Sequence, residues 1–257
     1  MTQTSASLLR DLQAGVKPLP ITKAMAAWDR RLTPEAVQRV HDQELLDLGG
    51  DRSSGEGRLR GSLLGSPCAR EQMLSYRGYL SADPDEVGDD LMRDGTERHY
   101  LWQKVGLSAG FLSDIETKVS LPEWKFGGQL DGLMAPTDDW PGRGGFELKT
   151  TKWDYFKEVR DSRQVLHKHL LQIGGYFKAL DLDWFSVVYE VRGFRIDWIE
   201  LMVENTPALR AMTEANFGGQ LRWIERGELP PPLPDYPTNR HCSYWCGYTR
   251  ICPSAEW

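Results

Sequence analysis

Three polar residues stand out in two short segments that otherwise read as β-strands. Asp131 lies in GGQLDGLM, and Glu147 and Lys149 lie in GGFELKT. Side chains two residues apart on a strand leave the same face, so Glu147 and Lys149 are expected to be neighbours. Adjacent strands lie roughly 4.8 Å apart, and a loop of about ten residues suits a hairpin-like connection. At matching height, Asp131 and Glu147 could therefore share one divalent cation.

This arrangement predicts a specific chemistry. Two carboxylates are hard oxygen ligands that suit Mg²⁺. A bound ion would lower the pKa of a water molecule and screen a phosphate, as in metal-assisted phosphodiester hydrolysis. Lys149, beside Glu147, could orient the attacking water or stabilise charge that grows on the phosphate. The alternative is a solvated strand face carrying an ordinary surface ion pair.

The order Asp, then Glu-x-Lys, resembles the signature of the PD-(D/E)xK nuclease superfamily. Two further features resemble its RecB-like members in particular. His99 stands upstream in GTERHYLW, within a predicted helix. Downstream, QIGGY supplies Gln172 and Tyr176, four residues apart on one predicted helix face.

The resemblance implies a role for each of these residues. Asp131 and Glu147 would bind the catalytic metal and His99 would assist as a third ligand. An imidazole ligand makes Mn²⁺ as suitable as Mg²⁺. The catalytic set implied by the family comprises Asp131, Glu147, Lys149, Gln172 and Tyr176. Glu116, one alternating glutamate of a predicted strand, is interpreted as ordinary strand exposure and is left outside the site.

The four cysteines form one remote residue and one cluster. Cys68 lies upstream of the motifs, and Cys242, Cys246 and Cys252 form C-x3-C-x5-C. This is not the paired C-x2-C pattern of a zinc ribbon. It resembles the iron–sulfur nucleases of the AddB and CRISPR-adaptation types, in which one cysteine precedes the nuclease motifs and three follow.

That resemblance implies a [4Fe–4S] cluster held by all four thiolates. The cluster would tie the end of the chain to the start of the core and have a structural role. The spacing departs from the family pattern C-x2-C-x5-C by one residue. Zinc and unligated thiols therefore stay open as alternatives.

Hydrophobic periodicity predicts alternating helices and strands. Strands are expected from about residue 111, over 125–135 and 144–151, and as a pair within 184–203 around an Arg192-Gly193 turn. Helices are expected over 33–49, 66–80, 83–110, 162–181 and 205–227. With the resemblance, this predicts an α/β restriction-endonuclease-like core with a mixed sheet flanked by helices, plus a cysteine-rich clasp.

Three regions are expected along the chain. Residues 1–60 would form a helical N-terminal region, with a polar break at 49–57. Residues 61–230 would form the nuclease core. Residues 231–257 would comprise a Pro-rich spacer and the cysteine cluster that returns to Cys68.

Composition bounds the location and the partners. The chain has 257 residues, a formal net charge of −6, and no apolar run of the roughly 20 residues that a membrane span needs. Its first residues lack the pattern of a secretory signal, so a cytoplasmic protein without a membrane partner is expected. Reduced thiols in that compartment favour ligand roles over disulfides.

A local surplus of cations next to the catalytic strand suggests where DNA would bind. Aromatic residues are interleaved with these cations, as in grooves that track a single strand. A solvated helix face with core aromatics is the alternative. The cations singled out are Lys152, Arg160, Arg163 and Lys168, with Arg240, His241 and Arg250 as a second rim.

Together these features predict a metal-dependent DNA exonuclease that acts on DNA ends or single strands in recombination, repair or processing. The chain lacks a G-x-x-x-x-G-K-[ST] motif, so it would act alone, as a homo-oligomer, or with a separate recombination or helicase partner. Two alternatives remain. One is a nuclease that trims DNA for CRISPR spacer acquisition, and the other is a non-catalytic scaffold that binds DNA ends.

Overall fold

The computed structural model describes residues 17–49, 56–83, 85–193 and 197–256. Three sequence expectations fall partly outside these ranges. They are the first 16 residues of the N-terminal region, most of the polar break at 49–57, and residues 194–196 after the Arg192-Gly193 turn.

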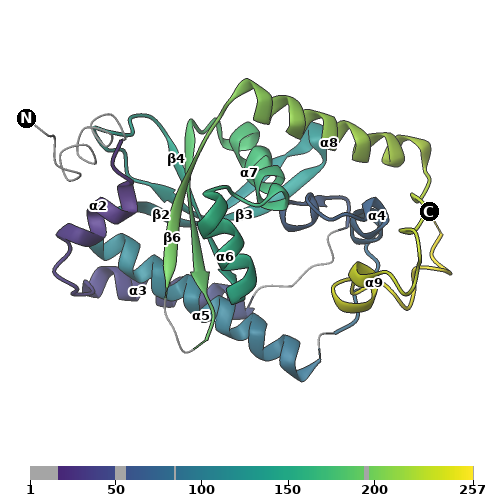
Figure 1. Ribbon diagram of the computed structural model, residues 1–257, viewed down its shortest axis with the longest axis horizontal. Helices are drawn as coiled ribbons and strands as arrows, with labels where there is room; N and C mark the ends of the chain where they lie inside the picture. The colour runs from purple at the N-terminus through teal and green to yellow at the C-terminus, as the bar shows by residue number, and fades with distance from the viewer. Residues whose placement is uncertain (1–16, 50–55, 84, 194–196, 257) are drawn as a thin grey trace, which may run out of the picture.

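A mixed six-stranded sheet forms the centre of the structure (Figure 1). The strand order is β1-β3-β4-β5-β6, and β2 pairs with β3. The β1–β3 and β4–β5 pairs are parallel, whereas β2–β3, β3–β4 and β5–β6 are antiparallel. The bounds are β1 Leu59–Arg60, β2 Leu112–Leu121, β3 Phe126–Met134, β4 Gly144–Thr151, β5 Trp184–Val191 and β6 Trp198–Glu204.

Helices cover both faces of this sheet, and each face has its own apolar core. One core joins β3 and β5 to helices that include α6, α7 and α8, around Phe126, Phe156 and Phe185. The other joins β4 and β5 to α2 and α5, around Trp102, Phe146 and Val188. The predicted α/β class, with a mixed sheet flanked by helices, is confirmed. The helices are α2 Pro20–Ala27, α3 Pro34–Gly49, α4 Ala69–Tyr76, α5 Glu86–Ala109, α6 Trp153–Ser162, α7 His167–Leu180, α8 Pro207–Arg226 and α9 Arg240–Tyr244.

The strands β3 and β4 pair over only three residues each and then separate. We call the place where they separate the fork. Gly132 pairs with Phe146, and pairing continues from there toward Met134 and Gly144. The next residue on either strand, Asp131 or Glu147, is the first beyond the paired segment. The separation leaves backbone groups of both strands without a ladder partner and opens room for side chains between them.

The N-terminal helices pack against the sheet rather than extending away from it. Ile21 of α2 is fully buried. The buried carboxylate of Glu200 on β6 accepts the N–H groups of Ile21 and Thr22 at 3.0 and 2.8 Å. Because the first N–H groups of a helix have no partner within the helix, Glu200 both caps and anchors α2.

The elements expected from periodicity are present, with differences at their ends. Helix α4 begins at Ala69, so Cys68 is its N-cap residue rather than part of its first turn. The Ser66 hydroxyl accepts the Cys68 N–H at 3.1 Å. Helices α6 and α9 and the short strand β1 were not predicted, and α2 was expected only as part of a helical N-terminal region without bounds. Each is at most 10 residues long, too short for a clear periodic pattern.

Candidate active site

Asp131 stands at the point where β3 and β4 separate. Its Oδ2 accepts the backbone N–H of Leu148 at 2.7 Å. The Asp131 side chain thus satisfies a backbone donor of β4 that has no partner in the ladder with β3. Its Oδ1 lies 3.2 Å from Nδ1 of His99 on α5. Burial alone would raise the pKa of Asp131, but His99, Lys149 and the Leu148 N–H together outweigh burial and hold the pKa below its usual value. Asp131 is therefore an ionised carboxylate fixed by two partners.

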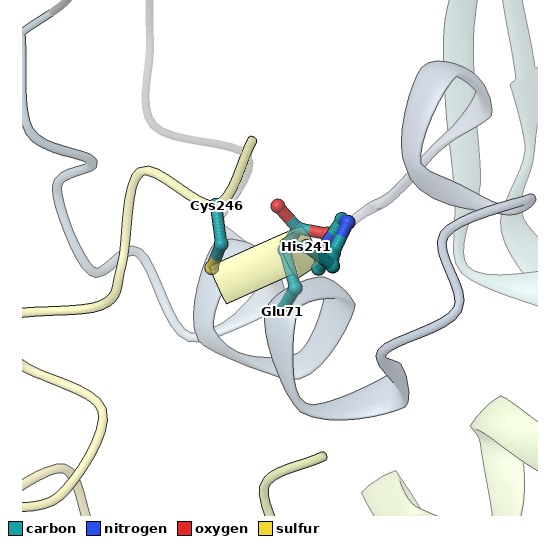
Figure 2. Close-up of side chains that lie close together, drawn as sticks. All are labelled: Glu71, His241 and Cys246. Carbon is teal, nitrogen blue, oxygen red and sulfur yellow. The ribbon is translucent and has the colours of Figure 1, made fainter. Parts of the chain in front are cut away.

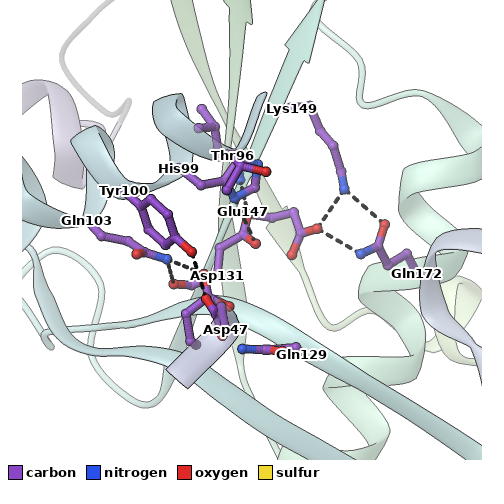
Figure 3. Close-up of polar contacts among 12 residues, drawn as sticks. Asp47, Thr96, His99, Tyr100, Gln103, Gln129, Asp131, Glu147, Lys149 and Gln172 are labelled. Carbon is purple, nitrogen blue, oxygen red and sulfur yellow. Dashed lines mark hydrogen bonds and ion pairs between the residues drawn. The ribbon is translucent and has the colours of Figure 1, made fainter. Parts of the chain in front are cut away.

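Glu147 lies on the α7 side of the gap between β3 and β4, where one of its carboxylate oxygens contacts Lys149 and Gln172 (Figure 3). Its Oε1 accepts from Lys149 Nζ at 2.6 Å and from Gln172 Nε2 at 2.8 Å. Its Oε2 is buried and has no hydrogen-bond partner among the described residues. Burial and the nearby charge of Asp131 raise the pKa of Glu147 to about 7. Two buried carboxylates with one unused oxygen are the arrangement that a cation relieves.

Helix α7 supports this side of the site. Gln172 bridges the pair, because its Oε1 also accepts from Lys149 Nζ at 3.0 Å. The hydroxyl of Tyr176 donates to the backbone oxygen of Gln129 at 2.7 Å and accepts from Gln172 Nε2 at 3.2 Å. Tyr176 is almost fully buried. It therefore positions Gln172 and strand β3, whereas Gln172 contacts the ionised pair directly.

Glu116 joins the site although the sequence analysis excluded it. Ligand atoms of His99, Glu116 and Asp131 all lie within 4.8 Å of one another. On β2, Glu116 falls between the register pairs Ile115–Gly132 and Thr117–Leu130, so it stands opposite Asp131. Its carboxylate accepts a short hydrogen bond from Gln103 on α5.

The backbone at Glu116 gives a second indication that this position is special. Its φ of 48° is unusual for a non-glycine residue in a strand. Burial and the charge of Asp131 raise the pKa of Glu116 to about 8. The alternation of residues on one strand could not reveal this, because the pairing register with β3 decides which glutamate meets Asp131.

An open cleft of about 1300 Å³ leads to these residues. Asp47, at the end of α3, reaches it and accepts a hydrogen bond from the Tyr100 hydroxyl at 2.9 Å. The N-terminal helical region thus contributes a carboxylate to the cleft wall, which no sequence pattern indicated. The cleft is lined by the potential metal ligands His99, Glu116 and Asp131, and also by Lys152, Arg192, Arg240, Tyr244 and Trp245.

The cations predicted to bind DNA lie in different places. Lys152 lines the cleft, but Arg160, Arg163 and Lys168 do not. Arg160 pairs with Asp161 at 3.2 Å. Of the second rim, Arg240 lines the cleft, whereas His241 turns away to contact Glu71.

The four cysteines come together where α4 meets the C-terminal segment. Burial is the main cause that raises the pKa of Cys68, and the nearby Cys242 adds to it. Cys252 acts likewise on Cys242, and burial, Glu71 and Cys68 raise the pKa of Cys246 to about 12. Cys68, Cys242 and Cys252 are buried, and Cys246 is partly buried.

One of the cysteines, Cys246, also belongs to a second group of potential ligands, together with Glu71 and His241 (Figure 2). The buried carboxylate of Glu71 accepts from the Ser66 hydroxyl at 2.5 Å and lies 2.9 Å from His241 Nε2. Ligand atoms of Glu71, His241 and Cys246 lie within 4.8 Å of one another. Zinc accepts sulfur, nitrogen and oxygen ligands, so this mixed set is also compatible with the zinc alternative.

We expect the metal-free protein to lose stability as the pH rises from about 5 to about 8. Glu116 and Glu147 have folded-state pKa values of about 8 and about 7, against 4.5 for an unperturbed glutamate. Between these values the folded state binds more protons than the unfolded state, so each group lowers stability by up to about 1.4 kcal/mol per pH unit. His99, whose pKa Asp131 raises against the effect of burial, acts in the same direction.

Thermal melting in EDTA across this range is the measurement. Glu116→Gln should flatten the upper part of the profile, because the uncharged amide removes the titration centred near pH 8. Adding Mn²⁺ should raise the melting temperature most at high pH, where the carboxylates are ionised. A melting temperature that is constant or increases from pH 5 to pH 8 in EDTA would contradict this electrostatic description.

Fold and site together define an α/β protein with a carboxylate-lined cleft at a fork between two strands. No protein-family model matches the sequence, and no curated protein matches it. Among solved structures, the chain is similar to an alkaline exonuclease (LHK-Exo) from Laribacter hongkongensis, with a TM-score of 0.48, 15% identity, and coverage of 66% of this chain and 89% of that chain. For LHK-Exo in complex with dAMP, the values are 0.48, 17%, 67% and 90%. SSO0001 is similar with a TM-score of 0.44, 15% identity and coverage of 85% and 94%.

Within the described ranges, none of the helices combines the length and apolar character that crossing a membrane requires.

Proposed function

We propose that the protein is a metal-dependent DNA exonuclease of the PD-(D/E)xK type, with a restriction-endonuclease-like core. One observation carries the proposal. Asp131 and Glu147 meet at the fork between β3 and β4, with His99 and Lys149 as their ion-pair partners. A purely structural ion pair would not need an open cleft beside it. A site that cleaves a phosphodiester bond must be open to its substrate, as this one is.

The donor set fits a divalent cation. His99, Glu116 and Asp131 offer one nitrogen and two oxygen atoms within 4.8 Å, and Glu147 adds the unpartnered Oε2 nearby. Oxygen ligands suit Mg²⁺, and the imidazole makes Mn²⁺ equally suitable. The raised pKa values of Glu116 and Glu147 also fit, because a bound cation would favour the ionised form of both carboxyl groups.

The residues of the chain would divide the work. When bound, the cation supplies charge that polarises the phosphate and acidifies a water molecule. Asp131, held by Leu148 N–H and His99, stays ionised and fixes the position of the site. Lys149, within 2.6 Å of Glu147, places a positive charge where a phosphate oxygen becomes more negative. Gln172 hydrogen-bonds to both Lys149 and Glu147 and would keep the two side chains in position relative to each other.

The C-terminal segment supports an exonuclease rather than an endonuclease. Arg240, Tyr244 and Trp245 line the cleft, so the Cys-rich segment forms part of its wall. Such a wall favours a strand that enters by its end. The protein would act in DNA recombination, repair or processing, alone, as a homo-oligomer, or beside a helicase or recombination partner.

We further propose that Cys68, Cys242, Cys246 and Cys252 hold a [4Fe–4S] cluster with a structural role. The clustering of the four thiols between α4 and the C-terminal segment supports this, and three of them, Cys68, Cys242 and Cys246, have raised pKa values. Anaerobically purified protein should contain iron and acid-labile sulfide, and Cys252→Ser should lose both and melt at a lower temperature. His241→Gln should keep them. Zinc in place of iron, lost in His241→Gln, would favour the mixed Glu71–His241–Cys246 site instead.

The experiment that tests the exonuclease proposal is a time course on end-labelled single- and double-stranded oligonucleotides with Mn²⁺ or Mg²⁺. Progressive shortening is expected for the wild type and should disappear in Glu147→Ala, because the substitution removes the anchor of Lys149. The position of the label would give the polarity. Intact DNA with every metal, bound equally by both proteins, would support the non-catalytic scaffold instead.

Two alternatives are separated by specific observations. A scaffold that only binds DNA ends has no need for Asp131, Glu147 and Lys149 in this geometry, and all three are present and in contact with site residues. Trimming of DNA for CRISPR spacer acquisition would use the same chemistry. It would be favoured if shortening stopped at a defined length only when an integrase complex was added.

A further inference from the structure

The wall of the cleft carries two exposed aromatic side chains. Tyr244 is 77% exposed and Trp245 is 56% exposed, the highest values among the large aromatic residues of the described chain. Both line the cleft that leads to Asp131. Aromatic rings of this size normally bury most of their surface, so an adjacent exposed pair facing a cleft is a candidate binding surface.

The backbone beneath these rings is held firmly. The N–H groups of Trp245 and Cys246 both donate to the His241 carbonyl, at 2.9 and 3.0 Å. The Thr249 hydroxyl donates to the carbonyls of Cys242 and Cys246, at 2.6 and 3.0 Å. A rigid backbone lowers the entropy cost of presenting the rings to a ligand.

Apolar side chains of α5 and three cations line the same cleft as the two rings. Val87, Leu91 and Met92 of α5 line the same cleft and are exposed to solvent. Lys152 Nζ lies 6.0 Å from the centroid of the Trp245 ring. Within the described residues, the cleft cations Lys152, Arg192 and Arg240 form no ion pair with a carboxylate.

We propose that Tyr244 and Trp245 form a base-stacking platform that makes the cleft select single-stranded nucleic acid over duplex. Bases would stack on the two rings and face the apolar side chains of α5, while Lys152, Arg192 and Arg240 pair with the phosphates. Only an unpaired strand can place the faces of successive bases on aromatic rings, because a duplex keeps them stacked on one another. The inference rests on the proposed nuclease function, since the stacked strand leads to the carboxylates that line the cleft.

Binding measurements on two matched double variants test the platform. Tyr244→Phe/Trp245→Phe keeps two flat rings, whereas Tyr244→Leu/Trp245→Leu keeps apolar bulk without a ring face. The probes are a fluorescent oligothymidylate and a blunt duplex of the same length, titrated by anisotropy with Ca²⁺ in place of Mn²⁺. Melting temperatures and iron content verify that each variant retains the native structure.

The leucine variant should bind the single strand at least about 10-fold more weakly than the wild type, and the phenylalanine variant should bind it nearly as well. Duplex binding should change little in either variant. Equal single-strand affinity of the leucine variant and the wild type would overturn the platform, as would an equal loss for single strand and duplex. A loss in the phenylalanine variant as large as that in the leucine variant would also overturn it.

Cleavage by the same preparations separates this inference from the proposed function. With Mn²⁺, the leucine variant should show a raised KM for single strands with kcat retained, because the carboxylates and Lys149 are unchanged. Wild-type protein that cleaves while the leucine variant binds normally would overturn the platform alone. Wild-type protein that neither binds nor cleaves either probe would overturn both.

Discussion

Replacing Asp131 by asparagine is expected to lower kcat for phosphodiester cleavage by at least about 10³-fold. The amide oxygen can still accept the Leu148 N–H, so the fork between β3 and β4 should keep its shape. The variant loses the negative charge that pairs with His99 and that would neutralise a divalent cation. Loss of activity should therefore be accompanied by loss of metal affinity rather than by unfolding.

Calorimetric titration with Mn²⁺ and single-turnover cleavage of an end-labelled oligonucleotide measure the two effects. Asp139→Asn is the matched control, because Asp139 lies outside the cleft and pairs with Lys23 at 2.6 Å. It should bind Mn²⁺ and cleave as the wild type does. An Asp131→Asn protein that binds Mn²⁺ normally and retains more than about a tenth of the activity would remove Asp131 from the metal site.

Replacing Lys149 by methionine should lower kcat by about 10²- to 10³-fold while Mn²⁺ binding is largely retained. Methionine keeps the length and apolar stem of lysine but removes the charge that lies 2.6 Å from Glu147 and 3.0 Å from Gln172. The difference between this result and that of Asp131→Asn would separate stabilisation of the developing charge from metal binding.

The Lys149 variant should also shift the pH dependence of cleavage. Lys149 is one of the groups that lower the pKa of Glu147 against the effect of burial and of Asp131. Without it that pKa rises, so the acidic limb of the pH–rate profile should move to higher pH. Lys178→Met, at a cation lying over the Trp124 ring outside the cleft, is the control and should show no shift. A Lys149→Met protein with unchanged kcat and an unchanged pH profile would exclude the proposed role of Lys149.

Much of the framework follows from local pattern. The strand over 144–151 has the bounds that alternation predicts, and the helix that carries His99 runs through 86–109 as periodicity indicates. These elements are long and strongly patterned, so short-range preferences decide them. Asp131 and Glu147 lie near one another just beyond the paired segment of β3 and β4, and the short connection between these two antiparallel strands already suggested this.

Short elements and surface cations were less predictable. Helix α6 has only 10 residues, and of the cations predicted to bind DNA, Lys152 just before it lines the cleft, whereas Arg160, Arg163 and Lys168 do not. The sequence predicts that His241 contributes a cation to a DNA-binding rim, because no acidic residue is near it in sequence. In the structure it pairs with Glu71, which is 170 residues away along the chain. Long-range ion pairs of this kind have no local signature.

The sequence by itself determined which residue types could perform metal-assisted hydrolysis and the order in which they occur along the chain. It also determined most of the strands and helices that carry them, because side-chain periodicity is a local property. Long-range packing brings Glu116 and Asp47 to the site and Tyr244 and Trp245 to the cleft, and it leaves one buried oxygen of Glu147 without a hydrogen-bond partner among the described residues. Strand register and helix docking set these positions, and both are determined by contacts between residues far apart in the chain.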